Sequence, residues 1–191
     1  GFFSPTASLI EAATYETIKE TGVNHIIESD MWYSDDALDR YRVYAELSYA
    51  QKYGLTVTVR DQRLYTMGAN GETATVETVQ NAVANYKDYQ SFTGLFIYDE
   101  PKSTAYPNVG TWKGHNEVGT YSSVAKAIAA AGYEGWSNAF GGDADLFYNR
   151  YNSEAGCYML YGYYNYLQNM VDSYDLDFMS FTCYPFTVEG N

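Results

Sequence analysis

The sequence predicts a single α/β domain over residues 1–191, a TIM (β/α)8-type barrel that is incomplete at its C-terminus after about six βα units. Short apolar runs alternate with helical stretches along the whole chain, as they do where helices wrap parallel strands. No glycine-rich phosphate loop follows the first strand, which argues against a doubly wound sheet. Polar residues follow every predicted strand, and in such barrels the active site lies at the strand ends.

The first three units are predicted from apolar runs and helix-end signals. Ser8 and Glu11 have the spacing of a capping box at the start of the first helix, and Gly22 is expected to end it. An apolar stripe marks the second helix, which Gly54 ends. The strands of these units are expected over residues 1–5, 23–28 and 55–59, and the helices over about 8–22, 36–53 and 76–89.

The clearest strand of the later units is the apolar run over residues 94–98, which leads into Asp99, Glu100 and Pro101. The remaining elements are a helix over residues 118–131, a strand over 135–140, a tyrosine-rich helical region to about 174 and a strand over 178–183. A closed barrel needs eight units in about 250 residues. We therefore expect the chain to be part of a longer polypeptide that supplies two more strands.

Composition argues against several classes of protein. The net charge is −13 and the 11 basic residues are scattered, which disfavours nucleic acid and anionic membranes as partners. No apolar run approaches the roughly 20 residues that span a bilayer, so membrane insertion is not expected. The two histidines are isolated and Cys157 and Cys183 form no CxxC pair, so neither a zinc site nor another cofactor is predicted. Whether the two cysteines form a disulfide is left open.

Glu100 is the first candidate for a catalytic residue. The run GLFIYDEP ends a buried strand abruptly in two carboxylates, and the proline stiffens the turn. Glycoside hydrolysis needs a carboxylic acid that protonates the leaving oxygen and a second carboxylate. Apolar neighbours such as Tyr98 and Trp136 would raise the pKa of Glu100 for the acid role. Alternatively, the two carboxylates cap the next segment or pair with Lys102.

The same run resembles the fourth-strand motif of retaining, clan-A-type (β/α)8 glycoside hydrolases, in which an Asn-Glu-Pro or related triplet carries the acid/base. It is more similar to a bacterial glycoside-hydrolase-like group with Asp-Glu-Pro in that place. The runs DLDFMSFTCYPF, TYETIKETGVNHII and GFFSP resemble other strands and units of that group. The resemblance implies a carbohydrate substrate and a secreted or cell-surface bacterial protein.

The resemblance also implies roles for single residues. Glu100 matches the acid/base position, and Asp99 stands where the larger clan has an Asn that contacts the sugar 2-hydroxyl. An Asp accepts a hydrogen bond from that hydroxyl but cannot donate one, which puts the standard retaining mechanism in doubt. The nucleophile of the clan follows the seventh strand, so it is expected beyond residue 191.

Other polar and aromatic residues near the predicted strand ends are secondary candidates for substrate binding. Trp32 and Trp136 would stack on a sugar face, and Asn138 and Tyr184 would bond a hydroxyl. The acidic candidates are Glu28, Asp30 and Asp61, which line the pocket or cap the helices that follow them. His25 is interpreted as a packed or hydrogen-bonded strand residue.

Two other functions stay open beside a glycosidase. One is a barrel that binds carbohydrate without cleaving it, which Asp99 and the absent carboxylate of the seventh strand leave open. The other is a metal-dependent barrel enzyme that uses Glu28, Asp30 and Asp61 as ligands. Barrels host many chemistries, so the fold class alone does not choose among the three.

Overall fold

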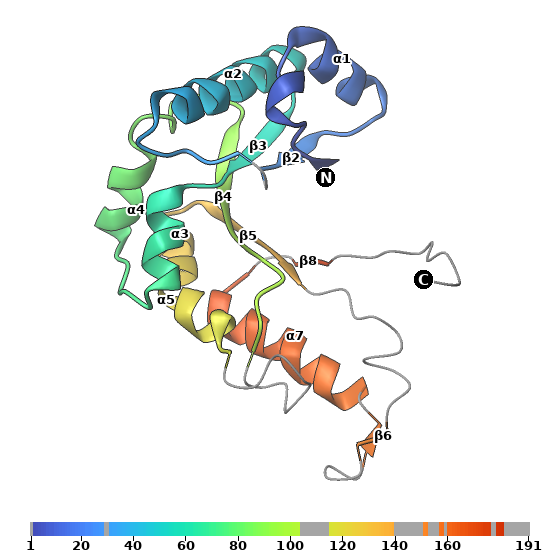
Figure 1. The fold of residues 1–191 in the computed structure, drawn as a ribbon, viewed down its shortest axis with the longest axis vertical. Helices are drawn as coiled ribbons and strands as arrows, with labels where there is room; N and C mark the ends of the chain where they lie inside the picture. Colours follow the sequence, from blue (N-terminus) through green and yellow to red (C-terminus); the bar gives the residue numbers. More distant parts are fainter. Residues whose placement is uncertain are drawn as a thin grey trace.

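The centre of the molecule is a parallel β-sheet whose strands lie side by side in the order of the chain, β1-β2-β3-β4-β5-β8 (Figure 1). The computed structural model describes residues 2–28, 31–103, 115–139, 151–152, 157–158, 160–176 and 179–181. The strands are β1 (Phe2–Phe3), β2 (His25–Ile27), β3 (Thr56–Val59), β4 (Phe92–Asp99), β5 (Glu134–Ala139) and β8 (Ser180–Phe181).

The helices lie along one side of this sheet (Figure 1). They are the 3-10 helix η1 (Ala7–Leu9) and the α-helices α1 (Ala12–Glu20), α2 (Ala37–Tyr53), α3 (Gln62–Ala69), α4 (Val76–Val83), α5 (Glu117–Ala130) and α7 (Leu160–Tyr174). Right-handed crossovers that always advance in the same direction put every helix on the same face. A short antiparallel pair, β6 (Tyr151–Asn152) and β7 (Cys157–Tyr158), stands apart from the sheet.

The prediction of a TIM barrel of six βα units is wrong, because the described residues form an open half-barrel. The body of the sheet is the four strands β2 to β5, whereas β1 and β8 have two residues each and lie at opposite edges. Two helices, α3 and α4, lie between β3 and β4, so the units are not regular. A barrel closes only when its first and last strands pair with each other. The hydrophobic pattern within a single strand does not specify that pairing.

Local signals predicted some helix ends correctly and missed others. Gly54 ends α2 in the left-handed conformation with φ 65°, as expected from the sequence. The predicted capping box of Ser8 and Glu11 does not form, since Ser8 lies in η1 and the side chain of Glu11 makes no capping bond to α1. A capping box instead begins α4, where Thr75 and Thr78 bond reciprocally.

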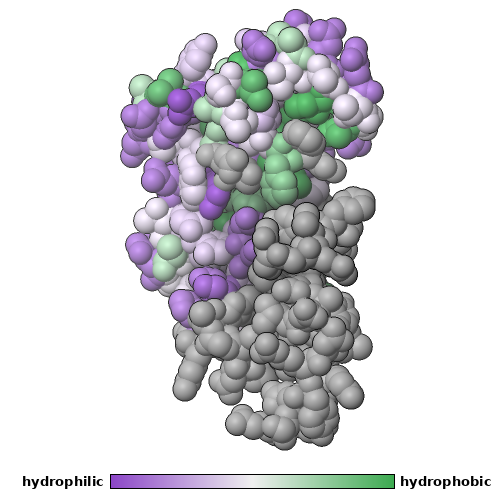
Figure 2. All heavy atoms as spheres, turned by 45° about the vertical axis from the view of Figure 1, so that its right-hand side comes forward, coloured by the Kyte–Doolittle hydropathy of each residue, from purple (hydrophilic) through white to green (hydrophobic). Residues whose placement is uncertain are grey.

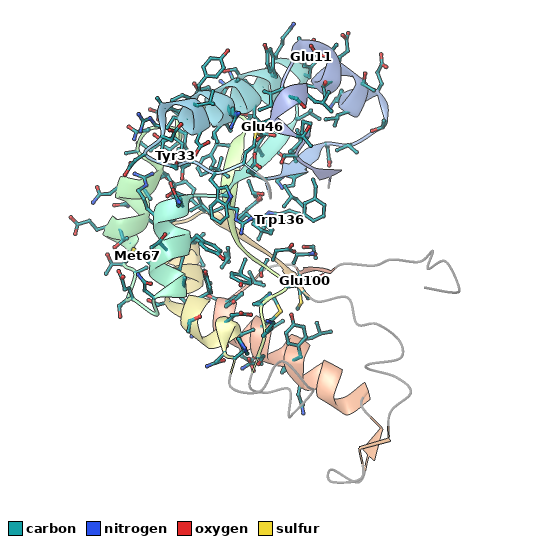
Figure 3. The ribbon with its side chains drawn as sticks, in the orientation of Figure 1. Glu11, Tyr33, Glu46, Met67, Glu100 and Trp136 are labelled. Carbon is teal, nitrogen blue, oxygen red and sulfur yellow. The ribbon has the colours of Figure 1, made fainter. Side chains whose placement is uncertain are left out.

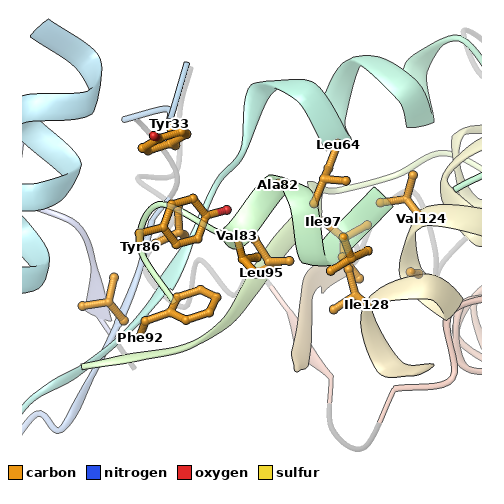
Figure 4. Packing of buried hydrophobic residues seen from close by; sticks show 14 of the residues in the cluster. Tyr33, Leu64, Ala82, Val83, Tyr86, Phe92, Leu95, Ile97, Val124 and Ile128 are labelled. Carbon is orange, nitrogen blue, oxygen red and sulfur yellow. The ribbon is translucent and has the colours of Figure 1, made fainter. Parts of the chain in front are cut away.

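The hydrophobic core fills the space between the sheet and the helices (Figure 4). Leu95 and Ile97 project from β4 toward apolar side chains such as Leu64 of α3 and Ile128 of α5. Half of the twelve largest fully buried side chains in the described ranges are tyrosines. These are Tyr15, Tyr33, Tyr86, Tyr121, Tyr166 and Tyr174.

The opposite face of the sheet is strongly curved. His25 of β2 stacks on Trp136 of β5 with ring centroids 4.5 Å apart and an interplanar angle of 13°. These strands are separated by β3 and β4, which in a flat sheet puts them roughly 14 Å apart. Curvature therefore brings the two rings together over the concave face. On the part of the surface that is coloured in Figure 2, hydrophobic residues gather near the middle and hydrophilic ones mainly toward the left-hand and upper edges.

Candidate functional site

The site is built at the carboxyl end of β4, where it meets β5. Asn138 of β5 is buried and donates a hydrogen bond from Nδ2 to Oδ1 of Asp99 at 3.0 Å. The amide of Glu100 donates to the carbonyl oxygen of Asn138 at 2.7 Å. The side chain of Asp99 is exposed and that of Glu100 is half-buried. Both residues of the predicted motif are therefore at least partly accessible at this edge, and Asn138 contacts the carboxylate of Asp99 and the backbone of Glu100.

A β-bulge in β4 decides which of the two carboxylates faces Asn138. Phe96 pairs with Trp136 and Asp99 pairs with Asn138, so β4 uses three steps where β5 uses two. The register shift lies between Phe96 and Tyr98, and Ile97 between them packs in the helix-side core. The extra residue reverses the alternation of side chains. As a result Asp99 shares the concave face with Phe96.

The backbone at Glu100 is strained. Its φ is 50°, a left-handed value that non-glycine residues rarely adopt. Such a conformation costs on the order of 1 kcal/mol or more and is concentrated at functional sites. Pro101 follows directly and is buried, so the surrounding structure fixes this geometry. In Figure 3, Glu100 lies near the ends of β4 and β5 that point away from α2.

A cationic and aromatic cluster adjoins the two carboxylates. The guanidinium of Arg60, at the end of β3, lies 3.6 Å from the ring centre of Trp32 and 5.7 Å from that of Phe96. Burial lowers the pKa of Arg60, while the negative charges of Tyr65 and Asp99 act in the opposite direction. Asp99 and Arg60 are therefore electrostatic neighbours, and the flat face of Trp32 lies beside them.

The stacked pair of His25 and Trp136 forms the base of this face. His25 Nδ1 lies 2.8 Å from Oγ1 of Thr56, and burial lowers the pKa of His25 to about 4. The imidazole is therefore neutral at pH 7, packed and hydrogen-bonded as its place within a strand predicted. Trp136 is half-buried and has one face against His25, which limits the ring surface that remains for a ligand.

Two of the predicted acidic residues are engaged in structural contacts. Asp61 is buried at the N-terminus of α3, where it accepts hydrogen bonds from Arg63 at 2.6 and 3.0 Å and from the Tyr86 hydroxyl at 2.9 Å. Glu28 is fully buried and its carboxylate accepts from Ser4 and from the amide of Met31.

Two further candidates, Asp30 and Tyr184, lie outside the described residues, as does Cys183. The structure thus brings Asp99 and Asn138 together beside the backbone of Glu100, and Arg60 links Trp32 to Asp99. Trp136 pairs with Phe96, at the other side of the bulge. It directs Asp61 toward the helices instead. Across the described ranges, no group of three His, Cys, Asp or Glu side chains is placed to hold a metal ion. No helix in the described part of the chain is long and apolar enough to cross a membrane.

Sequence reasoning missed Arg60 and Phe96 as residues of the site. The signal for Arg60 was the alternation along β3, because Val57 and Val59 pack in the helix-side core and Arg60 falls on the other face. Phe96 was hidden within an unbroken apolar run. Its position on the concave face follows from Leu95 and Ile97, its neighbours on both sides, which pack in the helix-side core.

Comparison with known proteins identifies a similar fold but no family. No model of a known protein family matches the sequence, and no curated protein matches it. Among solved structures, the chain is similar to the crystal structure of a "putative alpha-L-fucosidase" from Bacteroides thetaiotaomicron, with a TM-score of 0.55 and 12% sequence identity. The match covers 89% of this chain and 56% of that one, so the chain spans little more than half of that protein's length. At this identity the likeness concerns the fold alone.

Proposed function

We propose that this protein is a glycoside hydrolase and that Glu100 is its acid/base. The observation that carries the proposal is a strained, accessible Glu100 directly beside the hydrogen-bonded pair of Asp99 and Asn138. A carboxylic acid at a half-buried strand end, next to groups that bond hydroxyls, is what protonation of a glycosidic oxygen requires. The structural likeness to a protein described as an alpha-L-fucosidase supports the same reaction class.

The other residues of the site have binding roles in this proposal. Asp99 accepts hydrogen bonds from sugar hydroxyls, and Asn138 holds its carboxylate in place. The ring of Trp32 offers an apolar surface to a sugar face, with Arg60 fixing its orientation. The ligand is accordingly a neutral or hydroxyl-rich carbohydrate.

The first experiment compares Glu100→Gln with the unchanged protein, expressed at its natural length. The assay uses aryl glycosides, including α-L-fucosides, whose leaving groups range from acidic to weakly acidic phenols. Loss of a general acid slows poor leaving groups most, because they depend on protonation in the transition state. We expect a loss of roughly 100-fold or more for the poorest leaving groups and a smaller loss for the best.

Glu134→Gln is the matched control, because Glu134 is exposed at the opposite, amino end of β5. Equal loss of hydrolysis in both variants, or a loss in Glu100→Gln that does not depend on the leaving group, would remove Glu100 from the acid role.

A second candidate function is carbohydrate binding without cleavage. The observation that favours it is the exposed Asp99, which binds a hydroxyl without any contribution from Glu100. If the unchanged protein hydrolyses none of the glycosides, sugar binding on the same panel decides. Binding that survives Glu100→Gln but is lost in Asp99→Ala would establish the non-catalytic function.

A further inference from the structure

The backbone of Glu100 is held against its own local preference. A residue that precedes a proline favours an extended backbone with negative φ, and Pro101 follows Glu100 directly. The observed φ of 50° is opposite in sign to that preference. A strained conformation persists only where the surrounding structure fixes it. Contacts on both sides of Glu100 therefore supply what the local sequence does not.

The contact on the first side is made by the amide of Glu100 itself. This amide donates to the carbonyl oxygen of Asn138 at 2.7 Å, which ties the turn to the end of β5. A fixed amide plane still leaves rotation about the N–Cα bond open. The φ of Glu100 is therefore defined only when the chain after it is held as well.

The chain after Glu100 is held at Lys102, by a reciprocal pair of hydrogen bonds with the first turn of α5. The amide of Lys102 donates to Oε2 of Glu117 at 2.7 Å, and the amide of Val118 donates to the carbonyl oxygen of Lys102 at 3.0 Å. A hydrogen bond from an amide to a carboxylate is stronger than one between neutral groups. Pro101 lies between the two anchors and is buried, and its ring restricts its own φ.

The local sequence places Glu117 where it can make this bond. Glu117 is the first residue of α5, and Asn116 caps the helix by accepting from the Gly119 amide at 3.2 Å. First-turn amides have no partner within a helix, so that of Val118 bonds to a group outside it. A carboxylate is favoured at this positive end of the helix. The other carboxylate oxygen of Glu117 lies 3.9 Å from Nδ1 of His115.

We infer that Glu117 is a positioning residue that fixes the strained backbone of Glu100 through the amide of Lys102. The inference rests on the proposed function, in which the carboxyl group of Glu100 meets the glycosidic oxygen. Without the bond to Glu117, the segment after Pro101 relaxes, and Glu100 returns to the extended backbone that a residue before proline favours. Its carboxyl group then leaves its position, and a displacement of about 1 Å lowers a rate by roughly 100-fold.

Three variants, each expressed at the natural length of the protein, separate positioning from other roles of Glu117. Glu117→Ala removes the acceptor for the Lys102 amide. Glu117→Gln keeps a side-chain oxygen that accepts the same bond but removes the charge. Asn116→Ala is the matched control, because it removes the cap from the same helix end and leaves the acceptor for Lys102 in place.

The first readout is the backbone conformation of Glu100, which needs no hydrolysis. The amide hydrogen and the Hα atom of one residue lie closer together at positive φ than at negative φ, and NMR measures this distance. We expect it to lengthen in Glu117→Ala and to stay short in Glu117→Gln and Asn116→Ala. The Lys102 amide hydrogen is expected to exchange with solvent about tenfold faster, or more, in Glu117→Ala alone.

The second readout is the separation of kcat from KM on aryl glycosides. We expect Glu117→Ala to lower kcat about 10- to 100-fold, most for poor leaving groups, with little change in KM, because the displaced group is the acid. Glu117→Gln is expected to restore most of this loss. Asn116→Ala is expected to lower stability and to leave kcat within about threefold of that of the unchanged protein.

An unchanged short distance within Glu100 in the alanine variant would overturn the inference. Equal loss of kcat in Glu117→Ala and Glu117→Gln would overturn it too, because the charge of Glu117 would then act in the reaction. If Glu117→Ala does not fold, Glu117→Asp replaces it, since its side chain is one methylene too short for the bond to Lys102. If the unchanged protein hydrolyses none of the glycosides, the proposed function fails, and the NMR comparison alone decides whether Glu117 fixes the backbone of Glu100.

Discussion

Individual residues at the carboxyl edge of the sheet divide into those that present chemistry and those that hold the structure. Asp61 and Asp99 both follow a strand, yet their surroundings differ completely. Both oxygens of Asp61 accept bonds from Arg63, and the Tyr86 hydroxyl is a further donor. Asp99 is exposed, and among the described residues it accepts a hydrogen bond from Asn138. Residue type and position after a strand thus identify candidates, and the contacts made in the fold separate their roles.

The same division predicts opposite effects for two arginines. Arg60→Lys keeps the charge but loses the planar stack on Trp32, so we expect sugar affinity to fall about tenfold with little change in stability. Arg63→Lys loses the two-pronged bond to Asp61, so we expect about 1 kcal/mol lower stability with unchanged affinity. Titration calorimetry and urea denaturation measure the two quantities. The reverse pattern would exchange the roles of the two residues.

At the scale of elements, the bulge in β4 matters more for the site than the strand itself. Without the extra residue, strict alternation would place Glu100 rather than Asp99 on the face of Phe96. The bulge also ends the regular strand just before the strained Glu100. Bulges are known to redirect side chains near active sites, and here the bulge decides which of the two adjacent carboxylates shares the face of Phe96.

Close packing of α3 against α5 gives a prediction for one element. A Cβ atom at Gly68 would lie 2.2 Å from the ring of Tyr121. Gly68→Ala gains up to about 1 kcal/mol of helix propensity, but the clash is expected to outweigh it and lower stability by about 1–3 kcal/mol. Thr66→Ala, at an exposed position on the same helix, is the control. A rise in melting temperature for Gly68→Ala would contradict this packing.

At the scale of the whole molecule, the curvature of the half-barrel buries a titratable ring. His25 is 9% exposed beneath Trp136, and burial lowers its pKa from 6.5 to about 4. The unfolded chain therefore binds a proton at a higher pH than the folded one does. The stability that depends on neutral His25 is present above about pH 6.5 and is lost as the pH falls toward 4.

The low pKa of His25 predicts that the protein loses stability in acid and that a substitution of His25 reduces this loss. Between about pH 6.5 and about pH 4 the unchanged protein is expected to lose up to about 3 kcal/mol through His25. His25→Asn keeps a donor for Thr56 and removes the titration, so its profile is expected to be flatter. His115→Asn, at an exposed position, is the control. Identical slopes in His25→Asn and the unchanged protein would show that His25 does not titrate abnormally.

Much of the fold and part of the site could be predicted from sequence. The four main strands occur close to their predicted positions, because apolar runs bounded by glycine and polar residues are local signals. Asp99, Glu100 and Asn138 were predicted to lie at strand ends and do so. Helix α3 was missed because it is short and lies in a largely polar stretch, and the bulge in β4 was missed because it does not interrupt the apolar run.

By itself, the sequence determined the α/β class, the parallel order of the strands and the concentration of polar residues at their carboxyl ends. These follow from hydrophobic periodicity and turn residues, which act over a few neighbours along the chain. Only the tertiary structure decided that the sheet is an open half-barrel and that Asp99 faces Asn138. These features depend on strand register and on contacts between segments that are distant in the sequence. Local periodicity predicts neither of them.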